Sequence, residues 1–122
     1  MQKAIDINAD LGEGCGFDNR IMPLISSCNI ACGGHFGDED SITEALQLAK
    51  KHKVKVGAHP SYPDRENFGR KILKISKEKL KDSLLTQLRL IQSICDKNEI
   101  ELNHVILHGA LYKFDTIEKE VS

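Results

Sequence analysis

The sequence has 122 residues, of which 40% are hydrophobic, and its 17 basic residues nearly balance its 18 acidic ones. This length is enough for one domain with a buried core, but it is half of the ~250 residues that a closed (β/α)8 barrel needs. The charge balance excludes an electrostatic basis for binding nucleic acid or an anionic membrane, and no stretch approaches the ~20 apolar residues of a membrane span.

Four short, mostly apolar segments predict strands at residues 4–8, 27–32, 54–59 and 104–108. Between them, a short helical turn is expected over residues 20–25. A longer helix is expected after the capping residue Asp38, with an apolar face formed by Ile42, Ala45, Leu46 and Ala49. Another should follow Ser76, with its apolar stripe at Leu80, Leu84, Leu88, Ile91 and Cys95, and residues 115–120 look like the start of one more.

Strands that alternate with helices predict βαβ units and a parallel sheet. No repeat or linker divides the chain, so residues 1–122 are expected to form a single α/β domain. The four cysteines form no CxxC pair, and charged residues interrupt the N-terminal run that a secretory signal would need. We therefore expect a cytoplasmic protein with reduced thiols.

Residues capable of chemistry lie at or just after each predicted strand. Asp10 follows the first strand, His35 follows the second, His59 ends the third and His108 ends the fourth. Because the carboxyl ends of parallel strands meet at one edge of a sheet, these four side chains are expected to converge. Structural roles remain open as well: Asp10 could cap a turn in its glycine-rich loop, and Glu13 could be a solvated loop acid.

Two kinds of chemistry suit such a cluster. Imidazoles and a carboxylate can hold a divalent metal ion, or the same groups can move protons without a metal. The sequence leaves both open, since the candidate residues come from separate strands and form no local metal motif. Arg65 and Arg70 lie in the loop after the third strand, where they could bind an anion or form surface salt bridges.

Four blocks of the sequence, IDINADLGEG, SSCNIACGGHFGD, VGAHPSYPDRENFGR and HGALY, resemble in order and spacing the signature blocks of the LamB/YcsF family. The resemblance extends over essentially the whole chain. It implies a distorted (β/α) barrel similar to the glycoside hydrolase/deacetylase barrels, of which this chain would be the N-terminal half with parallel strands.

The resemblance also implies an activity. Bacterial members of the family act as the A component of 5-oxoprolinase, which with subunits B and C opens the lactam of 5-oxoproline to L-glutamate and couples this to ATP hydrolysis. Within that reaction we expect Asp10, His59 and His108 to transfer protons or position water. Substrate contacts are expected from Asn8, Glu13, Arg65, Arg70 and Tyr112. A divalent metal ion, if one is used, would be held by Asp10, His35 and His59.

The sequence departs from the family pattern in three respects. Gly34 stands where the family usually has phenylalanine, and Ile106 stands where it usually has lysine, two residues before His108. The third departure is length, which allows a fragment, a truncated product, or a half-barrel completed by a second copy or another chain. Two alternative functions therefore stay open: a metal-dependent amidase or deacetylase, and a non-catalytic binding module.

Overall fold

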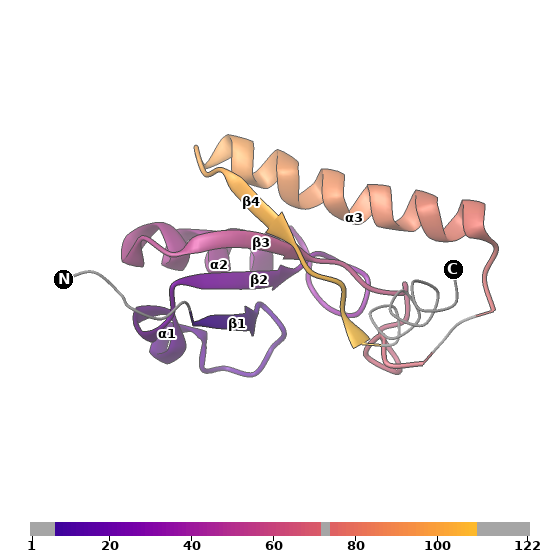
Figure 1. Ribbon diagram of the computed structural model, residues 1–122, viewed down its shortest axis with the longest axis horizontal. Helices are drawn as coiled ribbons and strands as arrows, with labels where there is room; N and C mark the ends of the chain where they lie inside the picture. Colours follow the sequence, from indigo (N-terminus) through magenta and orange to yellow (C-terminus); the bar gives the residue numbers. More distant parts are fainter. Residues whose placement is uncertain (1–6, 72–73, 110–122) are drawn as a thin grey trace.

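The computed structural model describes residues 7–71 and 74–109, which form a sheet of four parallel strands covered by helices (Figure 1). The strands follow the chain order β1-β2-β3-β4, so each βαβ unit places its second strand beside its first. The elements are β1 (Asn8–Leu11), α1 (Asp18–Ile21), the 3-10 helix η1 (Met22–Leu24), β2 (Ser27–Ala31), α2 (Glu39–His52), β3 (Lys55–His59), α3 (Lys77–Lys97) and β4 (Leu102–Val105). The predicted parallel α/β architecture is confirmed.

The sheet has one apolar face and one polar face. Strand side chains alternate between opposite faces, and on β2 and β3 the apolar positions pack into a core shared with α2 and α3. The core residues of the strands are Leu11, Cys28, Ile30, Val56 and Ala58, with Ala9 packed against them. The alternate positions, which include Asp10, Asn29 and His59, face the other way, so the polar groups gather on the uncovered face.

Helix α2 begins where the sequence predicts. The Asp38 side chain accepts a hydrogen bond from the Ser41 N–H, and the Ser41 hydroxyl accepts one from the Asp38 N–H, which together form a capping box. Its predicted apolar face is buried against the sheet. The helix ends at His52 and is capped by Lys53, whose backbone is left-handed with φ of 56°.

Helix α3 is capped by Ser76, as predicted, and its stripe is divided between two clusters. Ile91 and Cys95 are buried in the main core. Leu80 and Leu84 instead surround the buried ring of Tyr62 in a smaller cluster, beside the loop that follows β3. The helix therefore supports both the sheet and that loop.

Two predicted strand boundaries are wrong. β1 runs from Asn8 to Leu11, so Asp10 lies on the strand rather than after it, and residues 4–6 lie outside the described part of the chain. β4 ends at Val105, although the Ile106 and His108 N–H groups still donate to the carbonyls of Ala58 and Pro60. A regular ladder cannot continue there because Pro60 has no N–H to donate.

The helix start expected over residues 115–120 also lies outside the described residues. Within residues 7–71 and 74–109, no helix is both long enough and apolar enough to cross a lipid bilayer.

Candidate functional site

The carboxyl ends of the four strands bring together one carboxylate and three imidazoles. Glu13 comes from the loop after β1, His35 from the loop after β2, His59 from the end of β3 and His108 from the segment after β4. One ligand-type atom from each lies within 4.8 Å of all the others. The three histidines expose only 1%, 3% and 8% of their surface, so the cluster is shielded from bulk water.

Each histidine uses one ring nitrogen to bond to a residue outside the cluster. His59 Nδ1 lies 2.8 Å from the Ile106 carbonyl oxygen, and His108 Nε2 lies 2.8 Å from the Phe68 carbonyl oxygen. Because a carbonyl oxygen can only accept, both nitrogens are N–H donors. The His35 and His108 rings are stacked with centroids 3.7 Å apart, so their orientations are fixed by packing as well.

The other ring nitrogens point toward each other and toward Glu13. His35 Nε2 is 2.5 Å from Glu13 Oε2, and His59 Nε2 is 2.9 Å from His108 Nδ1. Glu13 Oε2 also lies 3.9 Å from His59 Nε2 and 3.7 Å from His108 Nδ1. Glu13 is therefore the central anion of the cluster.

Burial and mutual charge set the acidity of these groups. Burial would raise the pKa of Glu13, but the hydrogen bond from His35 and the charges of the three histidines outweigh it, so the pKa lies below 4.5. The pKa of His108 is lowered from 6.5 by burial and by the charge of His35, which outweigh the bond to Phe68 and the attraction of Glu13.

A buried glutamine on α3 holds the loop that positions His35. Gln87 Oε1 accepts from the Ser61 N–H, and Gln87 Nε2 donates to the Ser61 carbonyl. Ser61 Oγ in turn lies 3.0 Å from His35 Nδ1. A Cβ on Gly34 would lie 2.5 Å from Ser61 Oγ and 2.6 Å from Gln87 Oε1, so this arrangement leaves no room for the phenylalanine expected from the family pattern.

Asp10 lies beside the cluster rather than at its centre. Its Oδ2 is 3.5 Å from His59 Nε2, its Oδ1 accepts from Asn29 Nδ2, and its side chain is 47% exposed. It faces a hollow of about 430 Å³ that opens along the polar side of the sheet. The hollow is lined by Asn8, Asp10, Asn29, His59, Ile106, Leu107, His108 and Gly109. A small substrate placed there would contact the carboxylate and the edge of the His59–His108 pair.

The expected arginine contacts are directed elsewhere. Arg65 Nη2 donates to the Gly33 and Gly37 carbonyls and so ties the loop after β3 to the loop after β2. Arg70 is exposed, with its guanidinium 5.2 Å from the Phe68 ring centroid. Neither lines the 430 Å³ hollow, and Tyr112 lies outside the described residues.

Two residues on the polar face of the sheet, Asn29 and His104, were not predicted from the sequence. Asn29 is buried in the middle of β2, where it bonds to Asn8 and Asp10, and His104 Nε2 lies 2.7 Å from Asn29 Oδ1. The signal was an asparagine inside an otherwise apolar strand, which requires hydrogen-bond partners on neighbouring strands.

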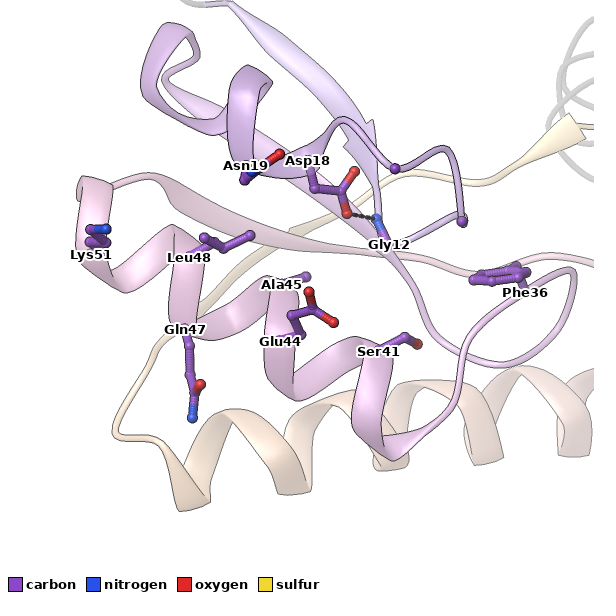
Figure 2. Close-up of a pocket in the computed structure, with 12 residues that line it drawn as sticks. Gly12, Asp18, Asn19, Phe36, Ser41, Glu44, Ala45, Gln47, Leu48 and Lys51 are labelled. Carbon is purple, nitrogen blue, oxygen red and sulfur yellow. Dashed lines mark hydrogen bonds between the residues drawn. The ribbon is translucent and has the colours of Figure 1, made fainter.

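A larger hollow, about 640 Å³, lies on the helical side of the loop after β1 (Figure 2). Gly12, Gly14 and Phe36 border it together with the exposed side of α2, and the Gly12 N–H donates to Asp18 within it. None of the cluster residues lines this hollow. We therefore place the candidate chemistry at the smaller hollow, which Asp10, His59 and His108 line.

Comparisons with known proteins identify the family of the chain. The model of the LamB/YcsF family matches residues 5–122. A protein of Histophilus somni (strain 129Pt), named as the A component of 5-oxoprolinase, is 46% identical over 110 residues, covering 90% of this chain and 44% of that protein. The protein of the same name from Staphylococcus aureus (strain bovine RF122 / ET3-1) is 43% identical over 123 residues, covering 97% of this chain and 49% of that protein.

A solved structure supports the same family assignment. The crystal structure of a lactam utilization protein from Thermus thermophilus matches with a TM-score of 0.85 at 43% identity, covering 90% of this chain and 47% of that one. The chain thus spans about half the length of the curated relatives it matches. On sequence and on fold, it belongs to the LamB/YcsF family.

Proposed function

We propose that this chain is the N-terminal half of the A component of a 5-oxoprolinase, and that it takes part in opening the lactam of 5-oxoproline to L-glutamate, coupled to ATP hydrolysis. One observation carries the proposal: the Asp10 carboxylate and the hydrogen-bonded His59–His108 pair border the same small polar hollow. The names of the similar proteins from Histophilus somni and Staphylococcus aureus support the choice of substrate.

The reaction needs both activation and proton transfer. A five-membered lactam is a stable amide, so phosphoryl transfer from ATP to its oxygen would make the ring carbon a far better electrophile. Water then adds to that carbon, and the C–N bond breaks as the nitrogen accepts a proton. A second water releases phosphate from the resulting acyl phosphate. The protein must therefore supply a base for water and an acid for nitrogen.

Asp10 suits the role of the base. Its Oδ1 is anchored by Asn29, which leaves Oδ2 facing the hollow, and its partial exposure keeps the carboxylate within reach of water. His59 and His108 suit the role of the acid, since ring nitrogens 2.9 Å apart can share a proton and pass it on. Asn8 also lines the hollow, where its amide bonds to Ser27 and Asn29 and so helps to hold the polar wall that a substrate would contact.

The similar proteins are named as one component of a multi-subunit enzyme, and we propose subunits B and C of 5-oxoprolinase as the partners of this chain. Because ATP is available and thiols stay reduced in the cytoplasm, the proposed reaction places the chain there. Completion of the barrel needs neighbours for both outer strands, β1 and β4. We propose that the second half of the family's length supplies them.

The test uses a chimera in which this chain replaces the matching half of the Staphylococcus aureus relative. The chimera is combined with subunits B and C of that organism, and glutamate and ADP are measured with 5-oxoproline as substrate. We expect ATP-dependent glutamate formation that falls at least ~100-fold in Asp10→Asn and in His59→Asn, the scale of a lost general acid or base. His52→Gln, at the far end of α2, is the matched control and should retain activity.

Each outcome decides between functions. Glutamate formed equally well without ATP would replace the proposal by metal-dependent hydrolysis. A folded chimera that binds 5-oxoproline but forms no glutamate would indicate a binding module. Full activity of the Asp10→Asn variant would remove Asp10 from the proposed mechanism.

A further inference from the structure

We infer that Glu13, His35, His59 and His108 form a binding site for one transition-metal dication of the zinc type. The inference rests on the ring nitrogens and the carboxylate of the cluster. Because the ion would occupy the inner nitrogens of His59 and His108, these two residues could act as the proposed acid only in the metal-free chain. The proposed ligand set contains Glu13, at the centre of the histidines, and not Asp10, which lies at the edge of the hollow.

His59 and His108 turn their lone pairs toward one another. The outer nitrogen of each ring donates its proton to a backbone carbonyl, so in a neutral imidazole the inner nitrogen has a bare lone pair. The two inner nitrogens, His59 Nε2 and His108 Nδ1, lie 2.9 Å apart. Two lone pairs repel at that distance, so a positive species has to lie between or beside them.

His35 is oriented in the same sense. The Ser61 hydroxyl donates to the Tyr62 carbonyl oxygen, so toward His35 it can only accept, and His35 Nδ1 is the donor. The inner nitrogen, His35 Nε2, lies 2.5 Å from the Glu13 carboxylate, and in the metal-free cluster its proton forms the hydrogen bond between them. A metal ion would replace that proton, because all three rings have one donor outward and the other nitrogen toward Glu13.

This orientation is the one found at metal centres. A metal-bound histidine nearly always donates its other N–H to a carbonyl, carboxylate or similar acceptor, which fixes the ring and raises its basicity. Here the acceptors are Ile106 O, Phe68 O and Ser61 Oγ. Ser61 is itself fixed by Gln87 from α3, so the outer contacts form a continuous support.

The spacing also suits a small ion. Four ligands at the ~2.0–2.1 Å distances typical of zinc lie about 3.3 Å from one another in a tetrahedron. Four of the six separations are 2.5, 2.9, 3.7 and 3.9 Å, on both sides of that value, and all six are within 4.8 Å. Side-chain shifts of about an ångström would therefore complete the site.

The ligand types select the ion. Imidazole nitrogen suits Zn²⁺, Co²⁺, Ni²⁺ and Cu²⁺, whereas Mg²⁺ and Ca²⁺ prefer oxygen ligands. Protons are the alternative occupants: one between Glu13 and His35, and one between His59 and His108, would also relieve the repulsion. Metal binding and proton binding are distinguished by experiment.

The experiment measures binding rather than turnover, so its result does not depend on the proposed reaction. The chelator-treated chain, shown to be folded by circular dichroism, is titrated with Zn²⁺ in a calorimeter and with Co²⁺ in a spectrophotometer. We expect one ion per chain and the visible absorption of four-coordinate Co²⁺, with no comparable binding of Mg²⁺ or Ca²⁺. In denaturant the site should vanish, because its ligands come from four distant segments.

Matched variants locate the ion. Glu13→Gln keeps the shape of the side chain and His59→Gln removes one ring; each should weaken Zn²⁺ binding at least ~10-fold, while His52→Gln and His104→Gln should not. The chimera gives the same readout in a full-length chain. Absence of stoichiometric Zn²⁺ binding to folded protein would overturn the inference and leave protons as the occupants. Binding unchanged in both Glu13→Gln and His59→Gln would overturn it too.

Discussion

The His104 ring on β4 lies directly over Gly57 on β3, so close that a Cβ at position 57 would overlap its Nε2, Cδ2 and Cε1 atoms. In this position His104 reaches across β3 to Asn29 on β2. Because Gly57 has no side chain, the His104 ring can cross β3 and link β4 to β2 on the polar face of the sheet.

Gly57→Ala should displace the His104 ring and break its bond to Asn29. Overpacking of this kind typically costs about 1–3 kcal/mol, and we expect a loss of that size in the free energy of unfolding measured with urea. In the double variant Gly57→Ala/His104→Ala the overlap is gone, so the combined loss should be at least ~1 kcal/mol smaller than the sum of the single losses. Additive losses would show that the methyl group and the ring do not meet.

Gln87→Leu should destabilise the chain although the new side chain is similar in size and apolar. It would leave the buried N–H and C=O of Ser61 without their partners. At about 1–3 kcal/mol for an unsatisfied group, we expect a loss of roughly 2–4 kcal/mol in urea unfolding. The control is Gln92→Leu on the exposed side of α3, where a change within ~0.5 kcal/mol is expected. Equal losses in the two variants would contradict the role of Gln87.

The four cysteines should differ sharply in reactivity. Burial raises the pKa of Cys28 and of Cys32 to about 12, and that of Cys95 to about 11, so these thiols stay protonated near neutral pH. Cys15 is exposed. Iodoacetamide at about pH 8 should therefore label one site on the folded chain and four on the denatured chain, as counted by intact mass. Rapid labelling of a second site without denaturant would contradict the buried placement.

Acid should destabilise the metal-free chain in two stages. The pKa of His108 is lowered in the folded chain, so the unfolded state binds the proton first and stability falls as pH drops below about 6.5. The pKa of Glu13 is also lowered, so a further loss begins as pH falls through 4.5. Urea midpoints measured in the presence of chelator between about pH 7 and pH 4 check this prediction. The first stage should be absent in His108→Gln; if it persists there, other groups are responsible.

The helices could be predicted from the sequence because their signals are local. Asp38 and Ser76 cap their helices through backbone N–H groups three residues away, and periodic apolar residues identify the buried side of each. The family resemblance and the parallel sheet were likewise accessible, since glycine-rich polar loops after short apolar strands are typical of this architecture.

The centre of the site could be predicted less well from the sequence, because it depends on strand register. β1 extends to Leu11, which puts Asp10 on the polar face of the strand and carries Glu13 into the cluster through a loop with Gly12 and Gly14 at φ of 71° and 80°. A slip of one residue in the register of β1 would turn Asp10 to the apolar face of the sheet. Likewise, the partner of Gln87 is a loop 26 residues earlier in the chain, and no local pattern announces that contact.

The contact between Glu13 and His108 joins the loop after the first strand to the segment after the last, across nearly the whole described chain. Helices α2 and α3 form from local contacts, whereas this one requires every strand to be in place first. Contacts of such long sequence separation are entropically expensive and tend to form late in folding. During synthesis or refolding, helical content should therefore appear before the imidazoles meet the carboxylate, so a chain that looks folded by its helices alone need not yet have an assembled site.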